Sequence, residues 1–285
     1  MKGSTLIVTS LFASLVGCWI LAPTACEWIA LGLMVCAGIP HGSFDLRVAE
    51  AKWRNSPCSR TRILIGYLLG VFGMTSLCVF FPTLGLSLFL VISALHFSEG
   101  ESNASTPPAL FLGAALGVSA ILLPIGLHAA QAQSYMGYFV PPDIFAALSE
   151  PLHILSCVVA TPLAGFLLLS LQQRRDEQSE NIQRIVCLIG WIILPPLAGF
   201  AVWFIGRHSR QHLKACHEVF SQHGTRIPLD FAVISALAIL GLLPFALYFD
   251  FSRIEELFAA SLCLIAGLTL PHMIVSHRMK ESLSL

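Results

Sequence analysis

The residues best suited to chemistry in this sequence are histidines at the ends of apolar segments. Two of them, His208 and His212, stand four residues apart in "WFIGRHSRQHLKAC", residues 203–216. On an α-helix this spacing places both imidazoles on one face, about 40° apart around the axis, so two ring nitrogens can reach one metal ion. The alternative is a pair of interfacial histidines with ordinary hydrogen bonds, and the spacing alone leaves both interpretations open.

Two further histidines have carboxylates close behind them in the sequence. His41 in "GIPHGSFD" precedes Asp45, and His96 in "SALHFSEGE" precedes Glu99 and Glu101. A metal-binding imidazole normally donates its second N–H to a carboxylate or carbonyl, which fixes the tautomer of the ring. We therefore predict that these carboxylates contact the histidines or line their pocket. The alternative is that Asp45 pairs with Arg47, while Glu99 and Glu101 are solvated at the membrane edge.

His272 and Arg207 complete the set of candidate site residues. His272 follows Pro271 in "LPHMIVSH", and a proline inside an apolar helix removes one backbone hydrogen bond and opens a kink. The kink lets His272 lean inward as a further ligand, as a donor to a bound oxygen species, or as the partner of a freed carbonyl; we favour a pocket position. Arg207 is expected to anchor its helix end or to pair with one of the three carboxylates.

The donor types decide which metal and which chemistry are expected. A site of four imidazoles has no carboxylate or thiolate ligand and suits Fe(II), Cu or Zn rather than Mg or Ca. The nine cysteines form no CxxC pair, so neither a zinc ribbon nor a disulfide framework is indicated. Iron with open coordination positions beside an apolar cavity points to oxygen chemistry, and the 19 Phe, 5 Trp and 4 Tyr are as compatible with ordinary packing as with a substrate tunnel.

The elements that carry these residues are predicted to be transmembrane helices. The 285 residues are 56% hydrophobic and 11% charged, with a mean hydropathy of +0.78, whereas about a quarter of residues are charged in soluble domains. Ionisable groups are costly inside such segments and are rarely kept without a role. A net charge of zero gives a nucleic-acid partner no electrostatic support.

We predict an all-α, polytopic transmembrane bundle of eight or nine helices in the inner or plasma membrane, in contact with lipid. It forms one domain over residues 1–285 with an uncleaved first helix. The stretch 128–150 is too polar to face lipid and is expected to be re-entrant or interfacial. The apolar runs lie near 5–22, 28–40, 63–81, 84–97, 108–127, 151–171, 185–205, 230–249 and 257–276.

The motifs together resemble the Brp/Blh family of membrane-embedded carotenoid cleavage enzymes, the β-carotene 15,15′-dioxygenases of bacteria and archaea. The matching pieces are "GIPHGSFD" (38–45), "SALHFSEGE" (93–101), "WFIGRHSRQHL" (203–213) and "LTLPHMIV" (268–275), in the family's order and spacing. The resemblance covers residues from about 28 to 278. One departure is Glu101, where the family leads us to expect aspartate, and another is Ser98, where glycine is common.

The resemblance implies a non-haem Fe(2+) ion held by His41, His96, His208 and His212. It also implies that O2 cleaves the central double bond of β-carotene, or a related carotenoid, into two molecules of retinal without an external reductant. Retinal is the chromophore of microbial rhodopsins, so the resemblance suggests a functional link to such a protein. In this interpretation the protein positions the polyene and tunes the metal.

Two other classes of membrane protein remain as alternatives from the sequence. A di-iron lipid hydroxylase or desaturase uses about eight histidines in several closely spaced boxes, and only one such box is obvious here. A transporter or a b-type cytochrome uses histidine pairs for protons or haem. The lack of an inverted-repeat signal and the carboxylates beside the histidines argue mildly against that class.

Overall fold

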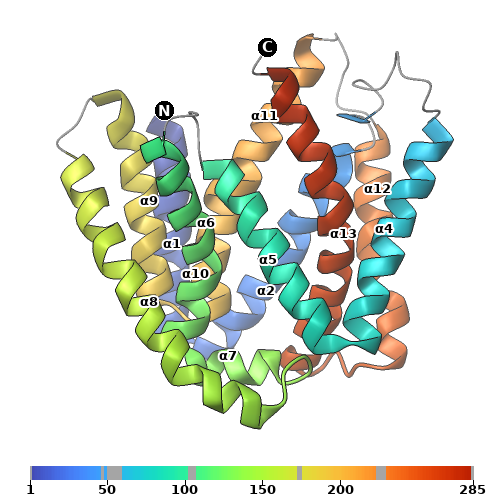
Figure 1. Ribbon diagram of the computed structural model, residues 1–285, viewed down its shortest axis with the longest axis horizontal. Coiled ribbons are helices and arrows are strands. Elements are labelled where there is room, and N and C mark those ends of the chain that lie inside the picture. The colour runs from blue at the N-terminus through green and yellow to red at the C-terminus, as the bar shows by residue number, and fades with distance from the viewer. Residues whose placement is uncertain are drawn as a thin grey trace. The chain divides into compact units, whose positions relative to one another are not determined.

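Helices make up nearly all of the computed structural model, which describes residues 2–45, 48–49, 60–101, 107–171, 175–222 and 229–283 (Figure 1). No strand occurs within these ranges, so the prediction of an all-α bundle is confirmed. The elements are α1 (Lys2–Leu21), α2 (Pro23–His41), η1 (Gly42–Phe44), α4 (Arg60–Phe80), α5 (Pro82–Glu101), α6 (Pro107–Leu127), α7 (Ala129–Met136), α8 (Pro142–Ser170), α9 (Arg175–Ile193), α10 (Pro196–Trp203), η2 (Phe204–Ser209), α11 (Arg210–Gln222), α12 (Leu229–Leu240), η3 (Leu243–Leu247) and α13 (Ile254–Leu283).

Many of these helices have the length and composition of membrane spans. Within the described ranges, seven are long and apolar enough to cross a membrane, and a shorter apolar helix covers Ala232–Leu247. Large side chains such as Leu21, Phe72 and Phe111 are exposed on them, as expected for surfaces that face lipid rather than water. The seven spans are Gly3–Leu21, Pro23–Phe44, Thr61–Phe80, Pro82–Glu99, Ala109–Leu127, Pro142–Ser170 and Ile254–His277.

Prolines set the main differences from the predicted segments. The apolar run 185–205 was predicted as one helix, but α9 ends at Ile193 and α10 begins at Pro196. Pro195 and Pro196 are adjacent and both lack a backbone N–H, so two successive helical hydrogen bonds are lost and the helix is interrupted here. The predicted interfacial stretch holds the short helix α7, and α8 then begins at Pro142, well before the apolar run predicted to start at residue 151.

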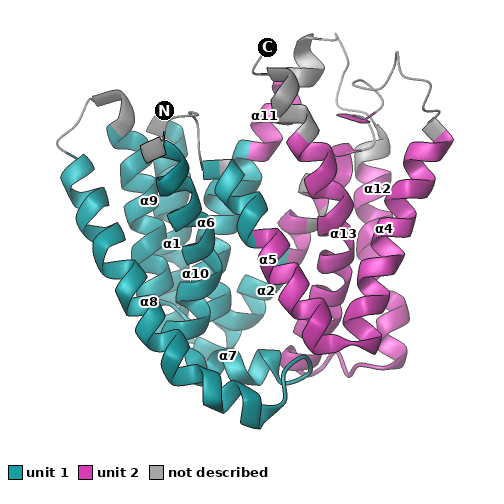
Figure 2. Cartoon of the chain, in the orientation of Figure 1, with its two compact units in different colours: residues 1–34, 94–211 teal, residues 35–93, 212–285 magenta. Residues whose placement is uncertain are grey.

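The chain divides into two compact units that alternate along the sequence (Figure 2). Unit 1 consists of Met1–Met34 and Ala94–Gln211, and unit 2 consists of Val35–Ser93 and His212–Leu285. Each of the helices α2, α5 and α11 has residues in both units. The single domain expected over residues 1–285 and the uncleaved first helix stay predictions.

Helices of unit 1 pack closely against each other at glycine residues. Helices α6 and α8 meet at Gly126, where an added Cβ atom would lie 2.1 Å from the Ser156 hydroxyl oxygen. Gly117 of α6 likewise accommodates Ser98 at the end of α5, because an added Cβ would lie 2.4 Å from the Ser98 nitrogen. Helix α1 packs against α9 and α10. Small residues let helices approach closely in a membrane, where packing and hydrogen bonds replace the hydrophobic effect.

Unit 2 is built around the pair α4 and α13. A Cβ atom at Gly267 of α13 would lie 2.2 Å from the Thr75 hydroxyl of α4, and that hydroxyl donates to the Cys263 carbonyl at 3.3 Å. The segment η1 contacts α12 and α13, and the Ser43 and Ser235 hydroxyls are 2.8 Å apart. These contacts hold the end of α2 and Asp45 against α12 and α13.

Candidate functional site

In unit 1, the imidazoles of His96 and His208 lie side by side among aromatic rings. Their ring centroids are 5.1 Å apart with an interplanar angle of 81°, and both residues are buried. Trp203 and Phe204 stack on His208, at 5.2 Å and 5.6 Å, and Phe97 meets its edge at 4.9 Å. These contacts fix the plane of the His208 ring and enclose it in apolar surface.

His208 lies in a π-helical turn, η2, which joins α10 to α11. Such turns contain an extra residue and occur frequently at functional sites. Arg210 ties the turn to its surroundings: its Nε donates to the Gly206 carbonyl at 2.9 Å, and its guanidinium also contacts Ser4 and, at 3.0 Å, Gln183. The expectation that His208 and His212 share one regular α-helix is therefore wrong, because the α-helical backbone begins only at Arg210.

The carboxylate of Glu101 and the guanidinium of Arg207 form a buried ion pair next to the π turn. Arg207 Nε donates to Oε1 at 2.6 Å and a terminal nitrogen donates to Oε2 at 2.7 Å, with both side chains almost fully buried. Trp203 Nε1 and Arg184 Nε each reach the same carboxylate at 3.4 Å. The other terminal nitrogen of Arg207 donates to Glu180 at 2.8 Å. The network joins the end of α5, which carries His96, to α9 and to the turn that carries His208.

The ion pair holds both partners in their charged forms. Burial by itself raises the pKa of Glu101, but the charge and hydrogen bonds of Arg207, with smaller contributions from Arg184 and Trp203, outweigh it and place the pKa below its usual value. Burial lowers the pKa of Arg207, and the charge and hydrogen bonds of Glu101 reverse this and raise it. The negative charge of Glu101 and the positive charge of Arg207 therefore compensate each other inside the protein.

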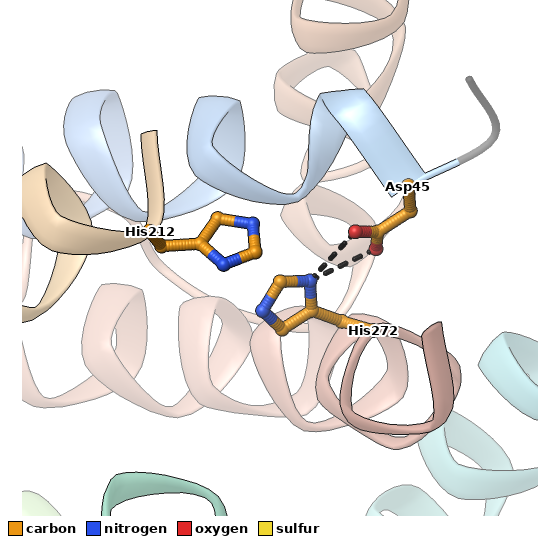
Figure 3. A group of neighbouring side chains, drawn as sticks. All are labelled: Asp45, His212 and His272. Carbon is orange, nitrogen blue, oxygen red and sulfur yellow. Dashed lines mark hydrogen bonds and ion pairs between the residues drawn. The ribbon is translucent and has the colours of Figure 1, made fainter. Parts of the chain in front are cut away.

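In unit 2, Asp45, His212 and His272 come together from three separate elements (Figure 3). One ligand atom from each residue lies within 4.8 Å of the others. His272 Nδ1 is 2.9 Å from Asp45 Oδ1 and 3.0 Å from Oδ2, which fits an N–H that donates to both oxygens. The His212 and His272 rings are 4.8 Å apart at an angle of 71°. Figure 3 shows the two imidazoles beside each other, with the carboxylate turned toward His272.

The surroundings of this group are partly polar and partly apolar. The Tyr67 hydroxyl donates to Asp45 Oδ2 at 3.0 Å, and the Ser276 hydroxyl lies 3.3 Å from His272 Nε2. The Cys216 sulfur lies 3.3 Å from His212 Nε2. A hydrophobic cluster packs next to these residues, and its buried members are Phe44, Val48, Ala49, Cys216 and Val275.

The structure thus places most of the predicted site residues in two groups. His96, His208, Glu101 and Arg207 belong to unit 1, and Glu99 is half-buried at the end of α5. Asp45, His212 and His272 belong to unit 2. The side chain of His41 lies outside the described residues, although its backbone ends α2; Arg47, considered as a partner of Asp45, lies outside them as well.

Several contacting residues were missed from the sequence. Arg184 and Glu180 lie on α9, and neither was named from the sequence as a partner of Glu101 or Arg207. Tyr67 was one of only four tyrosines and lies inside an apolar span, which is a usable signal for a buried hydroxyl with a partner. Nothing in the sequence indicated the contact between Cys216 and His212 beyond their spacing of four residues.

The residues present fit a transition metal by the chemistry of their donors. Two buried imidazoles adjoin each other in unit 1, and two imidazoles with a carboxylate converge in unit 2. Imidazole nitrogen with carboxylate oxygen is the donor set of non-haem iron sites, and it also suits zinc and copper. Asp45 orients His272 in the way that carboxylates orient metal-binding histidines.

The fold and these groups define a class: an all-α chain with several helices long and apolar enough to cross a membrane, and with buried histidines beside carboxylates and aromatic rings. A family model described as "Beta-carotene 15,15'-dioxygenase" matches residues 32–280, and the chain belongs to that family. A relative named β-carotene 15,15′-dioxygenase, from the uncultured marine bacterium 66A03, is 26% identical over 271 residues, which cover 87% of this chain and 92% of the relative. No solved structure matches the chain.

Proposed function

We propose that this protein cleaves the central 15,15′ double bond of β-carotene with O2 to give two molecules of retinal. The observation that carries the proposal is the family match over residues 32–280, which contains every candidate histidine of the two groups. A relative that shares most of its length with this chain is named for the same reaction. One oxygen atom enters each half of the polyene, so the reaction consumes no external reductant.

We further propose that Fe(II) serves the reaction and that His41, His96, His208 and His212 bind it. Support comes from the adjoining buried imidazoles of His96 and His208 and from the resemblance of all four motifs to the family. Iron in such a site supplies the one-electron chemistry that lets O2 react with an alkene. The membrane location of the protein is part of the same proposal, because β-carotene is apolar and dissolves in the lipid.

The residues of this chain contribute orientation and exclusion of water. The stacked rings of Trp203 and Phe204 hold the plane of His208 and keep its surroundings apolar. The ion pair between Glu101 and Arg207 lies within unit 1. It fixes the backbone near His96, on α5, and the backbone next to His208, in the π turn. Asp45 accepts from His272 Nδ1 and so fixes the tautomer that leaves Nε2 as the unprotonated nitrogen.

The test is expression of the full chain in bacterial cells that already make β-carotene. Cells with the wild-type chain should turn pale and accumulate retinal. The variants H96A and H208A should leave the colour unchanged and purify with less iron, whereas H217A, a histidine on the exposed face of α11, should behave as wild type. Intact β-carotene and no apocarotenal beside well-expressed wild-type protein would refute the proposal.

Metal analysis and absorption spectra of the purified protein separate the alternatives. Iron close to one per chain is expected. Iron near two per chain with a need for an electron donor would instead indicate a di-iron hydroxylase, and a Soret band would indicate bound haem. Retinal formed in the cell is expected to be available to a microbial rhodopsin where one is present.

A further inference from the structure

We infer that His272 and Asp45 are metal ligands together with His212, so that unit 2 binds one divalent transition-metal ion without His96 or His208. The inference rests on the proposed function in one respect, because His212 belongs both to the proposed four-histidine iron site and to the ligand set inferred here. It adds two ligands that the four-histidine set does not contain. The group lies entirely within unit 2 and comes from the end of η1, from α11 and from α13.

The first argument is the charge of Asp45. Its carboxylate is buried, with 2% of its surface exposed, and the described part of the chain offers it no lysine or arginine partner. Its partners are the ring of His272 and the hydroxyl of Tyr67. A buried carboxylate is costly unless a cation accompanies it. Glu101 in unit 1 shows the contrast, because an arginine pairs with it through two hydrogen bonds.

The second argument is the separation of the donor atoms. Two adjacent ligands of an octahedral ion with bonds of about 2.1 Å are separated by about 3.0 Å. In the structure His272 Nδ1 donates to Asp45 at 2.9 Å, so His272 Nε2 and a carboxylate oxygen of Asp45 are the atoms available to an ion. One ligand atom from each of the three residues lies within 4.8 Å of the others, so modest side-chain rotations would bring them to this separation.

The third argument is the type of donors. Two histidines and one carboxylate form the ligand set of non-haem Fe(II) oxygenases, which leave coordination positions open. The remaining positions are available to other imidazoles or to O2. The apolar neighbours Phe44 and Val275 limit the access of water to the group. The family's oxygen chemistry and this ligand set therefore agree.

A glycine lies next to the group. Gly42 precedes Asp45 by three residues, and a Cβ atom there would lie 3.6 Å from Asp45 Oδ2 and 3.6 Å from His272 Nδ1. These are ordinary contact distances, so the glycine backbone packs directly beside the pair. Any larger side chain at this position would lie against the proposed ligands.

The experiment measures Co2+ binding by the full-length protein in detergent, after its metal has been removed with a chelator. The variant H96A/H208A removes both imidazoles of unit 1. It should still bind about one Co2+ per chain and show visible absorption bands. When H272A is introduced into H96A/H208A, Co2+ binding should weaken at least 100-fold. When D45N is introduced into the same background, it should weaken at least 10-fold. Effects of this size are typical when a metal ligand or the group that orients it is lost. Adding H217A should change nothing, because His217 is exposed on the same helix as His212.

A second variant guards against failure to fold. In H272Q the amide can still donate to Asp45, and the protein should elute as one symmetrical peak while its Co2+ affinity falls as in H272A. Wild-type protein that binds Co2+ while H96A/H208A binds none would overturn the inference and leave the proposed function intact. Unchanged binding after loss of His272 would overturn it as well. Absence of retinal from cells with wild-type protein would count against the proposed function, whatever the Co2+ result.

Discussion

Replacing Arg207 with methionine should destabilise the protein strongly, because it leaves a buried carboxylate without its main partner. Arg207 donates two hydrogen bonds to Glu101, and both side chains are almost fully buried. After the change Glu101 retains only Arg184 and the Trp203 indole, each at 3.4 Å. Breaking a buried ion pair from one side typically costs about 3–5 kcal/mol. We expect the lower end, about 3 kcal/mol, because Arg184 still faces the carboxylate.

The assay is the apparent melting temperature of the protein in one detergent at neutral pH, followed by loss of the monodisperse size-exclusion peak after heating. Unfolding is expected to be irreversible, so values are compared at one heating rate. A loss of about 3 kcal/mol should lower the midpoint by about 6 °C or more for a chain of this size. The matched control is K214M, since Lys214 is exposed and its contact with Glu218 spans 3.8 Å.

The double variant R207M/E101L distinguishes an uncompensated charge from simple loss of packing. It removes both charges and leaves apolar side chains of similar size, which is often neutral or stabilising at buried ion pairs. Arg184 keeps its hydrogen bond to Asn181 at 3.0 Å. The double variant should therefore be more stable than R207M alone. A midpoint for R207M equal to that of wild type, or a double variant no better than R207M, would contradict this account of the network.

Three further outcomes follow from single contacts. The pKa of Glu101 is lowered in the folded state below its usual 4.5, so the unfolded chain binds more protons at low pH. The melting temperature should therefore fall as the pH drops below about 4.5, and the variant E101Q should lack this fall. G126A should lower the melting temperature, at a cost of about 1–3 kcal/mol, because its methyl group would meet Ser156, whereas G165A has nothing within 4 Å and should be neutral or slightly stabilising. Y67F removes one hydrogen bond of 3.0 Å to a carboxylate and should cost about 1–2 kcal/mol; no change in melting temperature would show that this bond contributes nothing.

The helices were largely predictable because a membrane protein satisfies its backbone within each helix. Apolar runs of about 20 residues therefore become spans whatever their neighbours, and α4, α6 and α13 begin or end close to the predicted limits. The break at Pro195 and Pro196 was visible in the sequence as two adjacent residues without an N–H, and it was overlooked because the residues on both sides are apolar.

The contacts of the site were less predictable, because they join residues far apart in the chain. His272 and Asp45 are 227 residues apart, and Arg207 and Glu101 are 106 apart, so no local pattern could select these partners. The sequence offered three carboxylates as partners for Arg207, and packing of α5 against the π turn decided among them. The π turn itself has no clear sequence signal, because α10 before it is apolar throughout and shows no apolar periodicity that an extra residue could shift.

The two buried acids differ in how their charge is balanced, and this difference can be measured without any substrate. Glu101 is paired with Arg207, so E101Q leaves a buried guanidinium with one partner fewer and should destabilise the protein even when a chelator is present. Among the described residues the partners of Asp45 are the His272 ring and the Tyr67 hydroxyl, with no lysine or arginine, so D45N removes an expensive charge and keeps an oxygen for His272. The metal-free D45N protein should therefore melt at the same temperature as metal-free wild type or higher, and only the wild type should gain stability when Co2+ is added. If D45N lowers the melting temperature of the metal-free protein as much as E101Q does, Asp45 is a structural hydrogen-bond partner and not a group that requires a cation.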